Sequence, residues 1–119
     1  MRKIILLVLL SIYFNSSKAV TYYVDSRVAN SGNGLSATSP FKSYSSVPLA
    51  NGDMVLFACG SSYSQSITLS LSGVTFGSYG SGAKPIFSNS ANWYVFLVSG
   101  TGITIDGLNF AFLPIQALN

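Results

Sequence analysis

The sequence predicts an all-β chain that folds as a solenoid, in which short strands form coils that stack on one another. Apolar and polar residues alternate over very short stretches, which is the period of a strand with one buried face. Turns rich in Gly, Asn and Ser separate these stretches. A weak repeat is also present, since the spacing of Val74, Phe76 and Tyr79 recurs at Ile103, Ile105 and Leu108. A β-sandwich is the alternative, because chance similarity between two Gly-flanked strands would give the same repeat.

Residues 1–19 have the layout of a secretory signal peptide. A basic start, Arg2-Lys3, precedes an apolar run, and Ser17-Lys18-Ala19 has small residues at the two positions that a signal peptidase reads. The apolar run is shorter than the roughly 20 residues that a membrane-spanning helix needs, so a membrane anchor is the weaker interpretation. We therefore expect cleavage after Ala19 and a secreted mature chain, extracellular or periplasmic, that comprises residues 20–119.

Loss of the signal peptide would change the charge of the chain. The whole sequence has six basic and three acidic residues, and three of the basic ones would leave with residues 1–19. The mature net charge would be 3 − 3 = 0, which gives no reason to expect nucleic acid or a membrane as a partner. The sequence contains no His, which excludes His-based triads and His-ligated zinc. The single Cys59 can form no intramolecular disulfide.

The first part of the mature chain, residues 22–47, is predicted to form a strand, a loop and one short helix. Residues 22–24 (YYV) have the composition of a short strand, and residues 25–40 read as a polar loop with tight turns. Pro40 can open a helix over residues 41–47, with Ser39 as its N-cap. This is the one helix that we expect in the mature chain.

Further short strands follow, separated by turns. The expected strands are residues 54–58, 67–69, 74–76, 85–87 and 94–98. Residues 77–82 are expected to be a turn-rich link, and residues 88–92 a polar loop. The strand at 94–98 is apolar on both faces, so we expect it to be covered on both sides. Residues 111–118 are apolar and lack a polar cap, so we expect the last coil to expose an unpaired edge.

The stretch GITIDGLNF, just before this apolar end, combines two strands with a bend. Ile103 and Ile105 alternate with threonines, and Leu108 and Phe110 alternate in the opposite parity. One straight strand would therefore put the two pairs on opposite faces. We expect a turn at Asp106-Gly107, so that all four apolar side chains face one core and are buried there.

The order of several short segments resembles that of a known family. Between Tyr22 and Phe110 these segments are YYVD, a GNG loop, SPFKS, NGDMVLFACG, ITLS, GVTFGSYG, KPIFS and GITIDGLNF. In this order they resemble the N-terminal part of secreted right-handed parallel β-helix proteins of the pectate lyase-like superfamily. The resemblance implies that residues 20–119 form the N-terminal cap and first coils of such a β-helix, and that this domain is incomplete.

The resemblance also implies a function. Many members of this superfamily are polysaccharide lyases, and others are hydrolases, epimerases or adhesins. The lyases typically use a Lys or Arg base, acidic residues and often calcium, because a cation must stabilise the charge that develops beside a uronate carboxylate. The chain is thus expected to be the N-terminal segment of a pectate or uronide lyase-like enzyme, with acidic polysaccharide as its partner.

No catalytic motif of the superfamily falls on this chain, so we expect no catalytic, cofactor-binding or metal-binding residue in it. Calcium would belong to later coils of the full-length family. Two alternatives remain for the function: a non-catalytic cell-surface or adhesive β-helix protein, and a small carbohydrate-binding β-sandwich. Parallel or antiparallel strand pairing separates the β-helix from the sandwich. The sequence predicts neither the substrate nor the oligomeric state.

The charged residues of the mature chain have two interpretations. They are Asp25, Asp53 and Asp106, and Arg27, Lys42 and Lys84. Calcium needs about six to eight clustered oxygens, and the three carboxylates are scattered along the chain. Turn chemistry is therefore favoured for Asp53 and Asp106, which lie beside Gly, and a calcium role is not favoured for Asp25 at its strand end. A lyase base needs an acidic partner and a cleft, and the sequence shows neither. Lys42 and Lys84 are therefore expected to be solvated surface charges.

Aromatic, Ser and Cys side chains are also candidates for binding or catalysis. Trp93-Tyr94 with Tyr79 could stack on sugar rings, but aromatic packing within or between coils is favoured. Residues 61–66 contain many hydroxyls but no base, so a Ser nucleophile has no support. Cys59 is expected to be a small buried hydrophobe rather than a reactive thiol.

Overall fold

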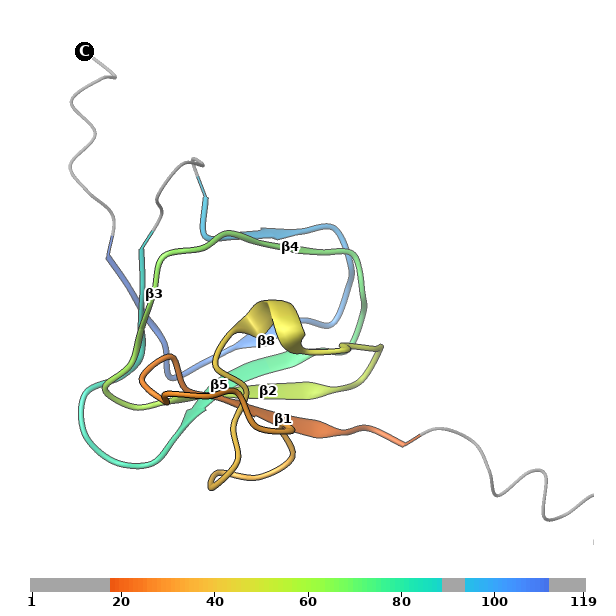
Figure 1. Ribbon diagram of the computed structural model, residues 1–119. Coiled ribbons are helices and arrows are strands. Elements are labelled where there is room, and N and C mark those ends of the chain that lie inside the picture. The colour runs from red at the N-terminus through yellow and green to blue at the C-terminus, as the bar shows by residue number, and fades with distance from the viewer. Residues whose placement is uncertain (1–17, 89–93, 112–119) are drawn as a thin grey trace, which may run out of the picture.

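A computed structural model describes residues 18–88 and 94–111 of the chain (Figure 1). In these residues the chain forms three sheets and one short 3₁₀ helix, η1 (Tyr44–Ser46). The first sheet contains β1 (Thr21–Val24), β2 (Met54–Ala58), β5 (Thr75–Tyr79) and β8 (Thr104–Ile105), in that order. The second sheet contains β3 (Ser62–Tyr63), β6 (Ile86–Phe87) and β9 (Asn109–Phe110), and the third contains β4 (Ile67–Leu69) and β7 (Phe96–Val98).

The chain visits the three sheets in a fixed order. From β2 in the first sheet it passes to β3 in the second and β4 in the third, and then β5, β6 and β7 repeat this circuit (Figure 1). Every ladder between the named strands is parallel. The all-β prediction is confirmed, and the parallel ladders do not fit a sandwich of antiparallel sheets. The arrangement is compatible with the stacked coils that the sequence predicts.

The weak repeat in the sequence corresponds to one circuit of the chain. Phe76 in the first copy pairs with Ile105 in the second, so the two copies lie side by side in one ladder. The preceding circuit is shorter, because Val55 pairs with Phe76 across a smaller interval of sequence. Turns of different length between the strands therefore hide the repeat elsewhere in the sequence.

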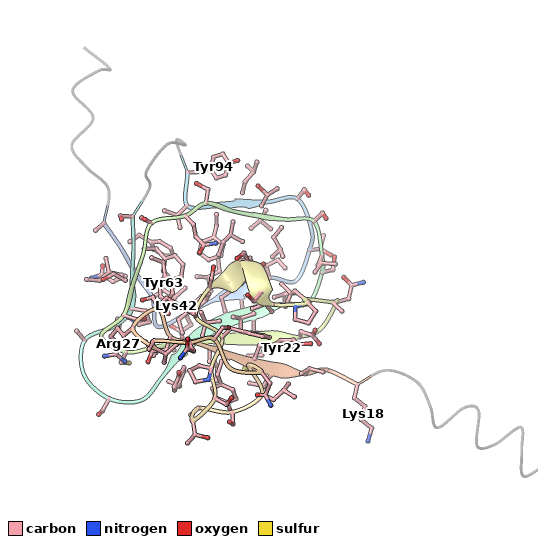
Figure 2. The ribbon with its side chains drawn as sticks, in the orientation of Figure 1. Lys18, Tyr22, Arg27, Lys42, Tyr63 and Tyr94 are labelled. Carbon is pink, nitrogen blue, oxygen red and sulfur yellow. The ribbon has the colours of Figure 1, made fainter. Side chains whose placement is uncertain are left out.

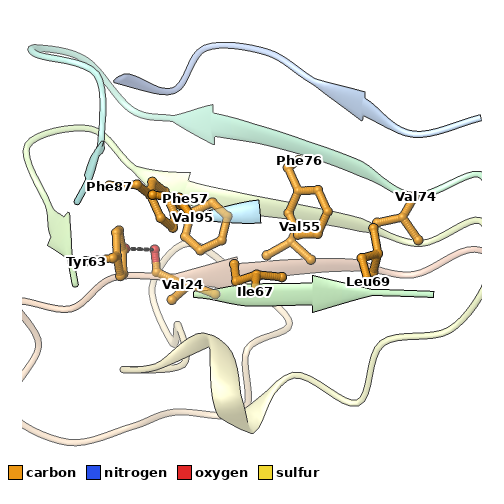
Figure 3. Packing of buried hydrophobic residues seen from close by; sticks show 10 residues of the cluster. All are labelled: Val24, Val55, Phe57, Tyr63, Ile67, Leu69, Val74, Phe76, Phe87 and Val95. Atoms are coloured by element: carbon orange, nitrogen blue, oxygen red, sulfur yellow. Dashed lines mark hydrogen bonds between the residues drawn. The ribbon is translucent and has the colours of Figure 1, made fainter. Parts of the chain in front are cut away.

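The core lies inside the circuit, between the three sheets (Figure 3). Its ten buried members are Val24, Val55, Phe57, Tyr63, Ile67, Leu69, Val74, Phe76, Phe87 and Val95. Phe57 is its aromatic centre, with its ring centroid 4.8 Å from that of Phe87 and 6.3 Å from that of Phe76. The alternation of side chains along each strand explains which residues are in the core. In β4, for example, Ile67 and Leu69 are buried and Thr68 between them is exposed.

A segment before β2 closes the open end of the first coil. Phe41 forms a parallel bridge with Val24, and the ring centroid of Tyr44 in η1 lies 6.4 Å from that of Phe57 and 6.0 Å from that of Phe76. Val47 and Leu49 also pack against the core. We call residues 41–49 the cap. Apolar cap side chains cover core residues that would otherwise face water at this end.

The predicted helix at 41–47 is wrong in length and in its N-cap. Phe41 is extended, because its N–H donates to the Tyr23 carbonyl (2.8 Å) and its carbonyl accepts from Asp25 N–H (2.8 Å). Helical structure starts only at Tyr44, and the N-cap is Ser43, whose hydroxyl accepts from the Ser45 N–H. Strand pairing with β1 thus overrides the local helix signal.

Three other expectations about the strands are corrected by the structure. β5 continues through residues 77–79, which were expected to belong to a turn, because Gly77 and Tyr79 pair with Leu56 and Ala58. β7 begins at Phe96 rather than at residue 94, since within the described residues it pairs with the three-residue β4 alone. The same strand is not covered on both sides, because Leu97 is 49% and Val98 39% exposed.

The expected bend before the last strand is present, but the burial around it is incomplete. Gly107 has φ = 73° between β8 and β9. Ile105 and Phe110 pair with the buried Phe76 and Phe87, yet remain 37% and 39% exposed. Complete burial of these two side chains was therefore a wrong expectation. β8 and β9 each have a ladder partner on one side only among the described residues.

Some expectations concern residues outside those described. They are the apolar run of the signal peptide, the loop at 89–92, Trp93 and the apolar segment from 112 onward.

Candidate functional site

The outer face of the first sheet carries an aromatic pair. Tyr23 and Tyr79 lie on β1 and β5 and project from the face opposite the buried Val24 and Phe76. Their ring centroids are 5.2 Å apart and their planes meet at 85°. The pair spans the intervening β2, so it forms only when three coils stack. Both tyrosines remain partly exposed.

Gly77 lies beside this pair on the outer face. It pairs with Leu56, which in turn pairs with Tyr23, so these residues lie in one row across the outer face. A Cβ added at Gly77 would lie 3.1 Å from Leu56 Cδ2 and 3.7 Å from the Asp106 carbonyl oxygen. The Leu56 side chain therefore already packs against Gly77, and any side chain at this position would press on it.

An ion pair lies where β1 ends. Arg27 Nε is 2.9 Å from Asp25 Oδ1, and Arg27 Nη2 is 3.1 Å from Asp25 Oδ2. The Arg27 N–H also donates to Asp25 Oδ1 at 3.0 Å. Hydrogen bonding from the Arg27 side chain holds the pKa of Asp25 below its usual value, and the same bond raises the pKa of Arg27. Both groups stay charged at neutral pH, which leaves Asp25 a weak base.

The Tyr79 hydroxyl is held in its protonated form. Burial is the main cause that raises the pKa of Tyr79 to about 12, and the negative charge of Asp25 adds to the effect. At neutral pH this hydroxyl is a hydrogen-bond donor and acceptor, not a base or nucleophile. Tyr23, Tyr79, Asp25 and Arg27 together offer two ring surfaces beside polar groups that bind hydroxyls. We call these four residues the tyrosine site.

Three turns stack next to the tyrosine site. Arg27 lies against Gly60, where an added Cβ would be 2.9 Å from Arg27 Nη1. Gly60 has φ = 86°, and its N–H donates to the Ala83 carbonyl at 2.7 Å. The turns that follow β1, β2 and β5 therefore contact one another in sequence along the stack.

Buried hydroxyls tie the second sheet to β1. Ser61 Oγ lies 2.6 Å from the Ala58 carbonyl and 2.8 Å from Tyr63 Oη. Tyr63 Oη in turn donates to the Val24 carbonyl at 3.2 Å (Figure 3). Burial raises the pKa of Tyr63. Ser61 thus contacts a carbonyl and a neutral phenol rather than a base, and the structure supports no Ser nucleophile at this position.

The expected aromatic platform is not formed between Tyr79 and Tyr94. Tyr79 belongs to the first sheet, whereas Tyr94 precedes β7 in the third sheet, on the far side of the circuit (Figure 2). Tyr79 packs on Tyr23 instead, which confirms aromatic packing between coils. Cys59 was expected to be buried but is only half-buried, with its Sγ 3.8 Å from the Gly80 carbonyl oxygen.

The remaining charged candidates lie apart. The Asp53 carboxylate is buried and accepts from the Val20 N–H at 2.9 Å and the Ala50 N–H at 3.0 Å, while Asp106 is exposed on the last coil. Residues 18–88 and 94–111 contain no group of three or more His, Cys, Asp or Glu side chains that could hold a metal ion. Lys42 and Lys84 are both exposed, as expected.

The tyrosine site was only partly visible in the sequence. Asp25 and Arg27 are two residues apart after a predicted strand, which is a local signal for an ion pair. Tyr23 and Tyr79 lie far apart in the sequence, on strands of different coils, and nothing local relates them.

Comparison of the chain with family models, with curated proteins and with solved structures finds no match. In the part of the chain that the structure describes, no helix is long and apolar enough to cross a membrane.

Proposed function

We propose that this chain is the N-terminal part of a secreted right-handed parallel β-helix protein that acts on polysaccharides, as the pectate lyase-like proteins do. One observation carries the proposal: the chain makes a repeated parallel circuit through three sheets, and residues 41–49 close its first coil. The signal-like residues 1–19 and the order of segments from Tyr22 to Phe110 support it from the sequence.

In this proposal the tyrosine site contacts polysaccharide. A tyrosine ring presents an apolar face that can stack on the C–H face of a sugar, and its hydroxyl can bond the sugar's own hydroxyls. The Asp25–Arg27 pair, with Arg27 about half exposed at 55%, adds charged acceptors and donors beside the rings.

We expect this contact to bind without turnover. A uronide lyase must hold a base and a cation-stabilised carboxylate in one cleft with accurate geometry. The groups at the tyrosine site do not meet this need, because Arg27 and Tyr79 both have a raised pKa and remain protonated. This favours, as a second candidate, the non-catalytic surface or adhesive β-helix over an enzyme whose chemistry lies in these residues.

The test measures binding and turnover on the same protein. The full chain, expressed with residues 1–19 in place and purified, would be titrated with soluble neutral and acidic plant polysaccharides by calorimetry. Tyr79→Leu keeps apolar volume but removes the ring face, and should weaken binding about fivefold, whereas the control Tyr94→Leu should not. Binding that is unchanged in Tyr79→Leu would contradict the tyrosine site.

Turnover is followed in parallel by the ultraviolet absorbance of unsaturated uronide products, with and without calcium. We expect no product from the chain. Product formation that disappears in Lys42→Gln or Lys84→Gln would show that one of these lysines is a catalytic base, and would overturn the proposal of binding without turnover.

A further inference from the structure

A buried carboxylate lies beside the residue that the predicted cleavage would make the first of the mature chain. Asp53 is 3% exposed, and its Oδ1 accepts from the Val20 N–H at 2.9 Å while its Oδ2 accepts from the Ala50 N–H at 3.0 Å. Within residues 18–88 and 94–111, no Lys or Arg side chain forms an ion pair with Asp53. Buried carboxylates in proteins are usually paired with a cation, so this one lacks the partner that its burial calls for.

Two hydrogen bonds fix the backbone of Val20 at this place. Its N–H donates to Asp53, and its carbonyl accepts from the Met54 N–H at 2.9 Å, next to the ladder between β1 and β2. Lys18 and Ala19, which precede Val20, are exposed, and Figure 2 shows Lys18 beyond the start of β1, apart from the other labelled side chains. The Val20 nitrogen is therefore held beside Asp53 by the fold itself, and not by the residues before it.

Cleavage of the chain before Val20 would supply the missing cation. A signal peptidase hydrolyses the Ala19–Val20 peptide bond with one water, whose hydroxyl goes to the Ala19 carbonyl carbon and whose hydrogen goes to the Val20 nitrogen. The new carboxyl group of Ala19 loses its proton at neutral pH, and the new amino group of Val20 gains one. A neutral amide at 2.9 Å from the Asp53 carboxylate thus becomes an ammonium group at the same position.

We propose that cleavage after Ala19 creates an ion pair between the α-ammonium group of Val20 and the buried carboxylate of Asp53, and that this pair fastens the cap to the first coil. The other oxygen of Asp53 binds Ala50, which directly follows the cap, so one carboxylate joins the new amino terminus to the cap. The folded state therefore reaches its full stability only after residues 1–19 are removed. This inference goes beyond the proposed contact with polysaccharide and rests on the predicted cleavage site.

The geometry fits one cleavage position. Residues of a strand are about 3.3 Å apart, so an amino terminus one residue earlier or later would move the ammonium group out of hydrogen-bond reach of Asp53. The small residues Ser17 and Ala19 indicate the same bond from the sequence.

The main experiment moves the amino terminus by one residue. The full chain, and a variant with one Ser inserted between Ala19 and Val20, are both exported with residues 1–19 in place, and mass spectrometry identifies the first residue of each. The variant keeps Asp53 and an amide N–H at Val20, as in the described fold. In urea denaturation its equilibrium constant for unfolding should be at least about tenfold larger than that of the unaltered protein, because Asp53 has lost its cationic partner.

A matched cycle of variants assigns the effect to Asp53. In the Asp53→Asn background the Ser insertion should change the equilibrium constant for unfolding by less than about twofold, because no charge remains to pair with the ammonium group. Asp106→Asn removes an exposed carboxylate and should leave the tenfold effect of the insertion in place. Circular dichroism checks that each variant is folded.

The reactivity of the amino group gives a second measurement that needs no change to Asp53. Acetic anhydride at neutral pH acetylates free amines, and peptide mass spectrometry follows the α-amino group with the exposed Lys84 as internal standard. Relative to Lys84, the α-amino group should react at least about tenfold more slowly in the unaltered mature protein than in the Ser-inserted variant, because pairing with a carboxylate favours the protonated form, which does not react.

The outcomes separate this inference from the proposed function. A first residue other than Val20, equal unfolding constants with and without the inserted Ser, an equally large insertion effect in Asp53→Asn, or equal acetylation of the two α-amino groups would each overturn the ion pair. None of these results bears on polysaccharide binding. Failure to bind polysaccharide would overturn the proposed function and leave the ion pair intact.

Discussion

Replacing Asp53 with alanine should loosen the cap from the first coil. The Asp53 carboxylate is 3% exposed and accepts from two backbone N–H groups, Val20 at 2.9 Å and Ala50 at 3.0 Å. Its position corresponds to that of Val74 in the next coil, because Thr75 N–H bonds to the Asp53 carbonyl and Thr104 N–H to the Val74 carbonyl. Asp53 thus places a hydrogen-bond acceptor, instead of an inward apolar side chain, just after the end of the cap.

The size of the effect follows from the two donors. A buried donor left without an acceptor costs about 1–3 kcal/mol, and both donors here are partly buried, so Asp53→Ala should lower the free energy of unfolding by about 2–4 kcal/mol. Asp53→Val copies the residue of the next coil and should not restore the loss, because it also lacks an acceptor. Asp53→Asn keeps one acceptor oxygen and should lose about half as much.

Urea denaturation followed by circular dichroism gives these values, with Asp106→Ala as the matched control. Asp106 is exposed, and its removal should change stability by no more than about 0.5 kcal/mol. Equal losses for Asp53→Ala and Asp106→Ala would refute the role of Asp53 in holding the cap.

Three further predictions concern the core, the tyrosine site and the N-terminus. Phe76→Ala should lower the free energy of unfolding, measured by urea denaturation, by about 3–5 kcal/mol, because Phe76 is fully buried. Ile105, its ladder partner, is partly exposed, so Ile105→Ala should lower the same free energy by less than about 2 kcal/mol. Equal losses would mean that the last coil is covered. Tyr79 should ionise near its pKa of about 12 in absorbance titrations, above the ordinary value of 10 that it has when unfolded. Because the unfolded chain loses this proton first, the contribution of Tyr79 to stability is present below pH 10 and lost towards pH 12, and Tyr79→Phe should remove that loss. Mass spectrometry of secreted protein should find Val20 as the first residue, and an earlier start would contradict cleavage after Ala19.

Local patterns were enough to predict most of the strands. Met54–Ala58 and Ile67–Leu69 occur at the predicted residues, because their apolar residues either run together or alternate with period two. The turn at Gly107 was predicted from a change of parity, which is also a local property. The ion pair of Asp25 and Arg27 was not predicted, although its two members are close neighbours in the sequence.

Contacts between coils depend on the tertiary structure, because their sequence separation varies from one circuit to the next. Phe76 pairs with Val55 across one circuit and with Ile105 across the next, and the second interval is longer than the first, so no single period aligns the strands. This is why the contact between Tyr23 and Tyr79 could not be predicted from the spacing of residues in the sequence.

The sequence by itself determined which residues form short, one-sided strands and where the chain turns, because these depend on neighbours close along the chain. The tertiary structure alone decided that Phe41 pairs with β1 rather than starting a helix, that β7 leaves Leu97 exposed, and that Tyr23 contacts Tyr79. Each of these outcomes depends on which strand a segment pairs with. That pairing is set by burial of a shared core, whose residues lie far apart in the sequence.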